Sequence, residues 1–474
     1  MHQVRTITTQ EVKTLFSQYP LIEKAVTHIY KNGGRAFLVG GAVRDMVLGL
    51  SVHDLDIEVH GLSFDQLAAL LRPLGEVNLV GKSFGVLKIA GTSIDWALPR
   101  TDSAGRKPEV TINPDMGIVE ALRRRDLTMN ALAIELQSGD FFDPFNGLED
   151  LKQGVLRSPD LAFFKDDPLR LYRVMQFIGR FEMYPDEALN AVCSSMDISQ
   201  VSRERKELEF EKLLLLSRRP SLGIRWLGVI GRLKEIAPEL ELTQHVEQNP
   251  SWHPEIWVFE HLMQALDAAT RSPLEGEEKL ILLYAALCHD LGKISTTVLE
   301  NGVLRSYGHP QAGVPYTRSL LQRITQKTAL IKAVELLVGH HMEPGQFVAL
   351  GATLSAYRRL ALKLGRSTNL QMLALLSIAD RQGRNGSGHE PLEERPAFID
   401  IFIKRAQEAC SLSTPVEALL HGRDIADLVE PGSAMGALVR FAYEEQIEHG
   451  ILDKQKLREL VIERIREEKN KVPT

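Results

Sequence analysis

Acidic and apolar residues alternate through residues 53–59, which read His-Asp-Leu-Asp-Ile-Glu-Val. A β-strand points successive side chains to opposite faces, so Asp54, Asp56 and Glu58 share one face and the apolar residues share the other. Clustered carboxylates raise one another's pKa unless a cation neutralises them, and their oxygens suit Mg²⁺ bound together with substrate phosphates. The segment therefore predicts a metal site. For Asp-x-Asp alone, a solvated outer strand face is the simpler alternative.

Two neighbouring segments favour the metal site. Residues 37–45 run from an apolar strand through Gly40-Gly41 into a helix start, where free backbone N–H groups can receive a phosphate. Residues 93–98 alternate in the same way and place Asp95 on the face opposite Ile94 and Trp96. Two carboxylates on one strand, one on another strand and a phosphate turn are what two-metal phosphoryl or nucleotidyl transfer requires.

A second set of possible metal ligands lies downstream. His261 lies on a helix predicted over residues 257–269, His289-Asp290 ends an apolar helix, and Asp380 follows. These side chains offer the nitrogen and oxygen ligands of a divalent-metal hydrolase, and His309 and His340-His341 could complete a second metal position. A single buried His-Asp pair is more often a hydrogen bond in the core, but four matching elements in order disfavour that interpretation.

The elements that position these residues change in type along the chain. The first thirty residues predict helix, and residues 36–39, 55–59, 86–90 and 94–98 predict strands around a helix near residues 64–71. Residues 99–117 are polar and rich in Gly and Pro, which predicts a mobile loop before a basic helix containing Arg123 to Arg125. Beyond Pro168 nearly everything predicts helix.

Composition and charge exclude several classes of protein. The chain has 474 residues, of which 44% are hydrophobic and 25% charged, values typical of a globular protein. No apolar run approaches the length of a membrane helix, and the N-terminus lacks the apolar core of a secretory signal, so we expect a cytoplasmic protein. The three cysteines, Cys193, Cys288 and Cys410, predict no disulfide framework. With a net charge of −6, nucleic acid would have to bind at local basic patches.

The motifs of the first 160 residues resemble the class II tRNA nucleotidyltransferase and bacterial poly(A) polymerase superfamily. The resemblance rests on Gly40-Gly41-x-x-Arg44-Asp45, on Asp54-x-Asp56 and on the runs at residues 124–131 and 143–151. It implies that Asp54 and Asp56 bind catalytic Mg²⁺ and that Asp95 is a third catalytic carboxylate. It further implies that the nucleotide lies against Gly40, Gly41, Arg44, Asp45, Arg125, Asp126 and Asn130.

The segment that begins at Asp166 resembles the Glu-Asp-x-x-Arg base-reading motif of this family, with Asp166 in place of Glu. Helical spacing puts five of its residues on one helix face: Asp166, Asp167, Arg170, Arg173 and Phe177. Cytosine and adenine both expose an exocyclic amino group, so an Asp acceptor with an Arg donor could admit CTP and ATP. The family assigns this role to Asp167 and Arg170, with Arg173 beside the nucleotide. An Asp before Pro168 is equally typical of an ordinary helix N-cap.

The downstream histidines and aspartates resemble the HD phosphohydrolase domain that some tRNA nucleotidyltransferases carry, and Trp252-His253-Pro254-Glu255 matches that subset further. The resemblance implies that His261, His289, Asp290 and Asp380 hold a divalent metal, with a transition metal possible. We expect an α+β fold with a mixed-sheet α/β head over residues 1–160. A helical neck (161–249), an HD region (250–390) and a helical tail (391–474) follow.

The expected activity is template-independent addition of CCA to tRNA from CTP and ATP, with release of pyrophosphate. Two alternatives stay open at this point. An A-only tRNA enzyme or a poly(A) polymerase would share the head motifs. A metal-dependent phosphohydrolase whose head only binds RNA would share the HD motifs, although the intact Asp54-x-Asp56 disfavours it.

Overall fold

Short apolar strands near the N-terminus assemble into a seven-stranded mixed sheet. The computed structural model describes residue 4 and residues 9–52, 54–80, 85–102 and 110–470. Across the sheet, β2 and β5 pair in parallel and the other neighbours pair antiparallel. In spatial order the strands are β3 (Val77–Val80), β4 (Val86–Ile89), β5 (Ile94–Ala97), β2 (Leu55–His60), β1 (Arg35–Val39), β8 (Ala133–Glu135) and β9 (Phe141–Phe142).

The alternation seen in the sequence decides which face of β2 is buried. Leu55, Ile57 and Val59 are at most 1% exposed, while Asp56 is exposed on the other face. The parallel register pairs Asp56 with Asp95 of β5, and the antiparallel register pairs Asp95 with Lys88 of β4. Three polar side chains thus lie on one face across three adjacent strands.

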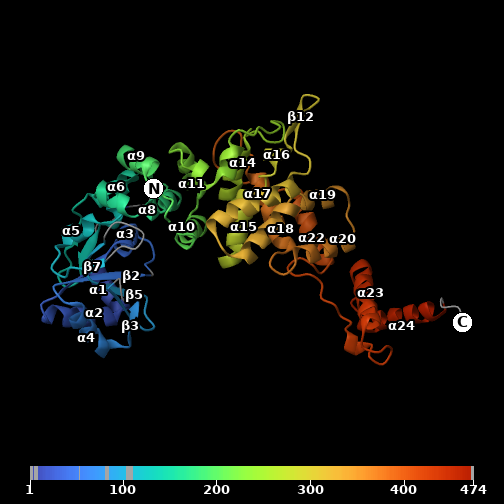
Figure 1. Cartoon of the computed structure of the whole chain (residues 1–474), viewed down its shortest axis with the longest axis horizontal. Coiled ribbons are helices and arrows are strands. Elements are labelled where there is room, and N and C mark those ends of the chain that lie inside the picture. Colours follow the sequence, from blue (N-terminus) through green and yellow to red (C-terminus); the bar gives the residue numbers. More distant parts are fainter. Residues whose placement is uncertain (1–3, 5–8, 53, 81–84, 103–109, 471–474) are drawn as a thin grey trace. The chain divides into compact units, whose positions relative to one another are not determined.

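Helices surround this sheet and extend the same unit (Figure 1). Helix α2 packs against β1 through a buried stripe that includes Ile22, Val26 and Ile29, and Ser63 and Gln66 form a capping box at the start of α4. The helices of the unit are α1 (Thr9–Gln18), α2 (Pro20–Lys31), α3 (Gly41–Val47), α4 (Phe64–Leu71), α5 (Ile118–Arg123), α6 (Gly147–Gln153), α7 (Leu161–Asp166), α8 (Leu169–Phe181), α9 (Glu187–Ser195) and most of α10 (Arg203–Leu216).

The structure corrects three sequence predictions in this unit. The segment 99–117 contains two short paired strands, β6 (Arg100–Asp102) and β7 (Val110–Ile112), while residues 103–109 lie outside the described part. The basic helix α5 ends at Arg123, so Arg124 and Arg125 follow it in a turn. The face predicted from Asp166 to Phe177 is interrupted, because Pro168 disfavours helical backbone at the residue before it and Asp167 is extended.

The second unit comprises residues 214–228 and 233–474, and helices make up most of its described regular structure. The helical expectation missed the hairpin of β12 (Val298–Glu300) and β13 (Val303–Arg305). Its longer helices are α11 (Ser221–Val229), α14 (Val258–Ala269), α15 (Gly276–Cys288), α17 (His309–Ile324), α18 (Thr328–His340), α19 (Glu343–Ala349), α20 (Leu354–Leu364), α21 (Leu370–Gln382), α22 (Ala397–Glu408), α23 (Ser433–His449) and α24 (Lys454–Asn470). Three short helices complete it: α12 (Leu233–Ile236), α13 (Pro238–Thr243) and α16 (Lys293–Thr296).

Helices α14, α15, α18 and α21 pack on one another and form the core of this unit. The nine residues Leu280–Cys288 of α15 are all buried, which explains why its sequence is apolar on every side. Near the C-terminus, α23 and α24 share a separate small cluster around Leu438, Leu457 and Val461. No helix in the described residues is long and apolar enough to cross a membrane. The α+β expectation is confirmed; the division into four regions stays a prediction.

Candidate functional sites

The first unit contains a pocket of about 490 Å³ on the polar face of β2 and β5. Asp56, Glu58 and Asp95 line it from the strands. Six arginines line it as well: Arg100, Arg124, Arg125, Arg170, Arg173 and Arg205. A wall rich in guanidinium groups beside a carboxylate pair suits a polyanion bound with cations.

The carboxylates of the pocket lie as the strand alternation predicts. Asp95 is the register partner of Asp56, and Lys88 Nζ lies 3.1 Å from Asp95 Oδ1. Although the Asp56 side chain reaches solvent, the surrounding protein partly desolvates its carboxylate and raises its pKa; the Arg125 charge opposes this, and the charges of Asp95 and Asp54 add to it. Asp54 is exposed directly before β2. The donor set consists of oxygens only, which fits a hard cation such as Mg²⁺.

Arg125 lies directly against the Gly40 turn. Gly40 has φ +73°, and a β-carbon there would lie 2.4 Å from Arg125 Nη1, so only glycine fits without displacing the guanidinium. On its other side, Arg125 Nη2 lies 4.0 Å from Glu58 Oε2. Glu58 Oε1 is 2.9 Å from His60 Nε2, and His60 Nδ1 is 2.8 Å from the Met116 carbonyl. Glu58 was not among the expected site residues, although its place two residues after Asp56 on one strand face signalled it.

A buried polar chain links the pocket to the start of α3. Arg173 Nε donates to Asp126 Oδ2 at 2.6 Å, and Asn130 Nδ2 donates to Asp126 Oδ1 at 3.0 Å. Arg44 in turn donates to Asn130 Oδ1 at 2.6 Å and to Asp45 Oδ1 at 2.9 Å. The sequence resemblance expected all five to contact the nucleotide. Asp126 and Arg173 line the pocket, and Arg44, Asp45 and Asn130 connect to them through the hydrogen bonds just described.

The surroundings of Asp126 and Arg44 explain the direction in which the pKa of each is shifted. Burial alone would raise the pKa of Asp126, but the Arg173 charge and the hydrogen bonds from Asn130 and Arg173 lower it to about 2. Burial lowers the pKa of Arg44 despite its pairing with Asp45. Arg44 is 4% exposed and its guanidinium lies 4.7 Å from the Phe181 ring centroid. Arg44 thus orders Asp45 and Asn130, and its contact with the nucleotide stays a prediction.

Replacing Asp126 with asparagine is expected to lower the free energy of unfolding of the first unit by about 3 kcal/mol at pH 7, since it leaves the half-buried Arg173 without its counter-charge. The folded pKa of about 2 lies below the unfolded value of about 3.9, so this contribution is present above pH 4 and is lost as pH falls toward 2. Urea unfolding followed by Trp96 fluorescence, with the other three tryptophans replaced by phenylalanine, measures it. The exposed Asp115→Asn is the control; equal losses from both variants would contradict the expectation.

Asp167 lies in the break between α7 and α8, and Arg170 lies in the first turn of α8. Asp167 Oδ1 accepts from the Leu169 backbone N–H at 3.1 Å, and its Oδ2 accepts from Arg205 at 2.8 Å. The N-cap of α8 is Pro168 and not Asp167, but one oxygen of Asp167 still accepts from the first N–H of the helix. Arg170 donates to the backbone carbonyls of Phe163 and Arg124. Both side chains line the pocket, each held in place by a protein partner.

In the second unit, four predicted ligands converge on one point. His261 Nε2 lies 3.1 Å from His289 Nε2, 3.4 Å from Asp290 Oδ2 and 3.2 Å from Asp380 Oδ1. His261, His289 and Asp290 are buried, and Asp380 is partly exposed. Nitrogen and carboxylate oxygen atoms this close together can serve as ligands of one metal ion.

A second group shares Asp290 with the first. His309 Nε2 and His341 Nε2 lie 3.2 and 3.7 Å from Asp290 Oδ1, and 3.2 Å from each other. Of the two adjacent histidines considered in the sequence, His341 completes this group, while His340 pairs with Glu343 instead. Asp290 thus offers one oxygen to each group.

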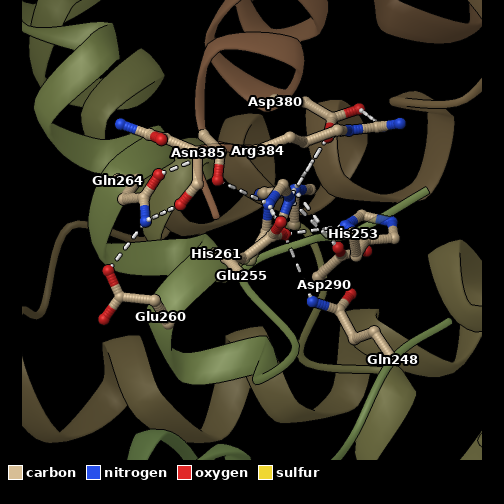
Figure 2. A network of polar contacts seen from close by, with 12 residues as sticks. Gln248, His253, Glu255, Glu260, His261, Gln264, Asp290, Asp380, Arg384 and Asn385 are labelled. Carbon is tan, nitrogen blue, oxygen red and sulfur yellow. Dashed lines mark hydrogen bonds and ion pairs between the residues drawn. The ribbon is translucent and has the colours of Figure 1, made fainter. Parts of the chain in front are cut away.

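The remaining nitrogen of every histidine in the two groups is occupied by an acceptor. His289, His309 and His341 direct Nδ1 to the carbonyls of Ala286, Ser306 and Val338, respectively. His261 Nδ1 lies 2.9 Å from Glu255 Oε1, which also contacts His253 (Figure 2). Such contacts fix the tautomer that leaves Nε2 free to bind a metal. Nitrogen-rich donors of this kind suit Zn²⁺, Mn²⁺, Fe²⁺ or Ni²⁺.

Outer residues that the sequence prediction omitted support both aspartates. Lys293 Nζ lies 2.7 Å from Asp290 Oδ2, and Arg384 contacts both oxygens of Asp380 (Figure 2). Nearby cations hold the pKa of both aspartates well below the usual range, although burial alone would raise it. Burial would also lower the pKa of His261, but Asp380 and Glu255 raise it to about 9. The sequence signal for a contact between Lys293 and Asp290 was their spacing of three residues.

Comparisons with known proteins agree with the geometry of the first unit. Residues 36–157 match the family described as the poly A polymerase head domain. The chain is 35% identical to the multifunctional CCA protein of Pasteurella multocida, over 79% of this chain and 90% of that protein. It is 33% identical to the multifunctional CCA protein of Nitrosococcus oceani, over 83% of this chain and 95% of that protein.

Solved structures show the same fold. The CCA-adding enzyme of Bacillus stearothermophilus in complex with CTP matches with a TM-score of 0.64 and 19% identity, over 96% of this chain and all of that chain. The resemblance drawn from the motifs is thereby confirmed. At this level of identity to the curated relatives, the chain belongs to the multifunctional CCA proteins, a family of tRNA nucleotidyltransferases.

Proposed function

We propose that the pocket of the first unit adds C, C and A to the 3′ end of tRNA from CTP and ATP and releases pyrophosphate. The in-register pair of Asp56 and Asp95 among six arginines carries this proposal. Asp54 and Asp56 would hold Mg²⁺, which supplies Lewis-acid charge where the 3′ hydroxyl attacks and pyrophosphate leaves. Arg125, held between Gly40 and Glu58, and Arg173, held by Asp126, would bind phosphate oxygens.

Base choice is assigned to Asp167 and Arg170. Asp167 would accept from the exocyclic amino group of cytosine or adenine, and Arg170 would donate to a ring acceptor. Two backbone carbonyls hold the Arg170 guanidinium, which supports a fixed donor. Arg205 donates to Asp167 Oδ2, and this oxygen has a second lone pair with which to accept from a base. We also propose that residues 99–117 move between C addition and A addition. If a deletion within residues 103–109 left A addition intact, this part of the proposal would be wrong.

The second unit is proposed to be a metal-dependent phosphohydrolase. His261, His289, Asp290 and Asp380 would hold one divalent transition metal, and Asp290, His309 and His341 a second. A phosphomonoester or a cyclic phosphodiester at an RNA end fits such a centre, because bound metal supplies Lewis-acid charge and an activated water. We place the whole protein in the cytosol, where tRNA and both nucleotides are present.

The direct test uses a tRNA transcript that ends before CCA. Incubation with Mg²⁺ and each nucleoside triphosphate singly and combined, resolved at single-nucleotide length, should give C, C and A followed by a stop. A long A tail would select a poly(A) polymerase, and A added only to a CC-ended tRNA would select the A-only enzyme. No addition would leave the phosphohydrolase as the principal activity.

Gly40→Ala is expected to raise the KM for both nucleotides at least tenfold, because a β-carbon at this position displaces Arg125. Gly33→Ala is the matched control: Gly33 has φ +84°, but a β-carbon there meets nothing within 4 Å. Both glycines have positive φ, but Gly40 combines it with ψ −132°, outside the left-handed helical region, so Gly33→Ala controls for positive φ alone. Steady-state kinetics of single-nucleotide addition separates them. An equal effect of the two variants would show that strain, and not Arg125, is responsible.

A further inference from the structure

The polar face of β2 ends at His60, the last residue of the strand. Because strand side chains alternate, Asp56, Glu58 and His60 share this face of the sheet. Asp56 and Glu58 line the pocket of the first unit. His60 is only 7% exposed, and its ring packs edge-on against Phe37, with 5.0 Å between the ring centroids. Nucleotide addition as proposed above assigns no task to this buried polar side chain.

Both ring nitrogens of His60 face acceptor oxygen atoms. Nε2 lies 2.9 Å from Glu58 Oε1, and Nδ1 lies 2.8 Å from the Met116 carbonyl oxygen. The next residue, Gly61, donates its backbone N–H to the Pro114 carbonyl at 2.8 Å. The end of β2 is therefore joined to residues 114–116 at two points, and the His60 ring bridges this backbone and Glu58.

The second oxygen of Glu58 faces Arg125. Glu58 Oε2 lies 4.0 Å from Arg125 Nη2, and the two side chains are 15% and 25% exposed. The Gly40 turn limits the Arg125 guanidinium from another side, since a β-carbon on Gly40 would collide with Nη1. The orientation of the Glu58 carboxylate thus affects where Arg125 lies, and His60 is the side chain that fixes this orientation.

We propose that His60 is a positioning residue for nucleotide binding, which fixes Glu58 so that Glu58 holds Arg125 toward the triphosphate. The inference rests on the proposed role of Arg125 in nucleotide addition and adds a residue that does not touch the nucleotide. Guanidinium groups bind phosphate oxygens best when their N–H groups already point at them. Because Met116 belongs to residues 99–117, the same contact connects that segment with the triphosphate.

Two substitutions separate the two contacts of His60. The amide nitrogen of glutamine takes roughly the place of Nε2, and that of asparagine roughly the place of Nδ1. His60→Gln therefore keeps the contact with Glu58 and loses the one with Met116, while His60→Asn does the reverse. Leucine at position 60 removes both.

The test is isothermal titration calorimetry of the full-length protein with Mg²⁺ and either CTP or inorganic tripolyphosphate. His60→Leu and His60→Asn are expected to raise the Kd for both probes at least about tenfold, the scale of a lost hydrogen bond to a charged group. His60→Gln should raise it less than about threefold, because the charged partner Glu58 is still held. Equal increases for all three variants, or no increase for any, would overturn the proposal.

The same titrations with alanine at position 125 decide whether His60 acts through the guanidinium. Arg125→Ala should itself raise the Kd, and adding His60→Leu should raise it no further, since both changes break one chain of contacts. The same increase from His60→Leu in both backgrounds would contradict the proposal. Glu135→Gln is the control: Glu135 is 7% exposed and pairs with Arg35 in the same sheet, and its loss should leave both Kd values unchanged.

Tripolyphosphate carries no base and no ribose, so its binding is independent of base choice and of chemistry on tRNA. If the wild-type protein adds no nucleotide to tRNA but its variants bind tripolyphosphate with the expected pattern, nucleotide addition fails as a function while the positioning role of His60 holds. If the wild-type protein adds CCA and the Kd values do not change in the variants, the positioning role fails alone. A wild-type protein that binds neither probe would reject both.

Discussion

Asp56→Ala is expected to lower nucleotide addition to tRNA at least about 10³-fold, because it removes the carboxylate that lies beside Asp95 and faces the arginine wall. The loss corresponds to about 4 kcal/mol of transition-state stabilisation, the scale expected for a metal ligand. Single-turnover addition of CMP to a tRNA transcript measures it. The isosteric Asp56→Asn should be equally inactive, since an amide lacks the charge.

Two comparisons make this result specific. Asp65→Ala, an exposed aspartate on α4 of the same unit, should leave addition unchanged. Phosphate release from a 2′,3′-cyclic phosphate should also be unchanged in Asp56→Ala. If Asp56→Ala abolished that hydrolysis and His289→Ala did not, the division of activities between the two units would be wrong.

Asp290→Asn should abolish phosphate release, by about 10³-fold or more, and lower the bound divalent metal of the purified protein toward zero. Asp290 contacts both ligand groups, so its loss damages both metal positions at once. Metal content after dialysis and hydrolysis of the cyclic phosphate are the two measurements. CCA addition should continue, which shows that the first unit of the variant is folded.

A buried aspartate away from the metal ligands provides the matched control. Asp267 is 2% exposed and accepts hydrogen bonds from Ser221, so Asp267→Asn removes an equally buried charge without touching a ligand. It should keep its metal and its hydrolytic rate. If Asp290→Asn retained metal, the two groups would have to be interpreted as ion-paired core residues.

The parts of the site that depend on local periodicity were predictable from the sequence. Strand alternation predicted that Asp56 and Asp95 lie on the polar face of the sheet, because a period of two follows from backbone geometry alone. The order of His261, His289, Asp290 and Asp380 likewise predicted a cluster, and the structure brings all four together.

The periodicity of the sequence does not show how deeply a side chain is buried or where a helix is interrupted. Arg44 carries a charge and follows a phosphate-type turn, yet Phe177 and Phe181 enclose it, a contact between residues more than 130 positions apart. The single face expected from Asp166 onward failed because one proline outweighed helical spacing. The contact between Arg125 and Gly40 depends on two distant segments meeting, which no local pattern encodes.

The length of the hairpin loop between β4 and β5 constrains the position of Asp95. Lys88 faces Asp95 across this hairpin, and Asp95 in turn faces Asp56, so residues 90–93 set the offset of all three. Adding or removing one residue there would turn Ile94 or Trp96 toward the arginine wall and Asp95 into the core. The length of a four-residue connection, which contains no ligand, therefore controls whether the acidic centre exists.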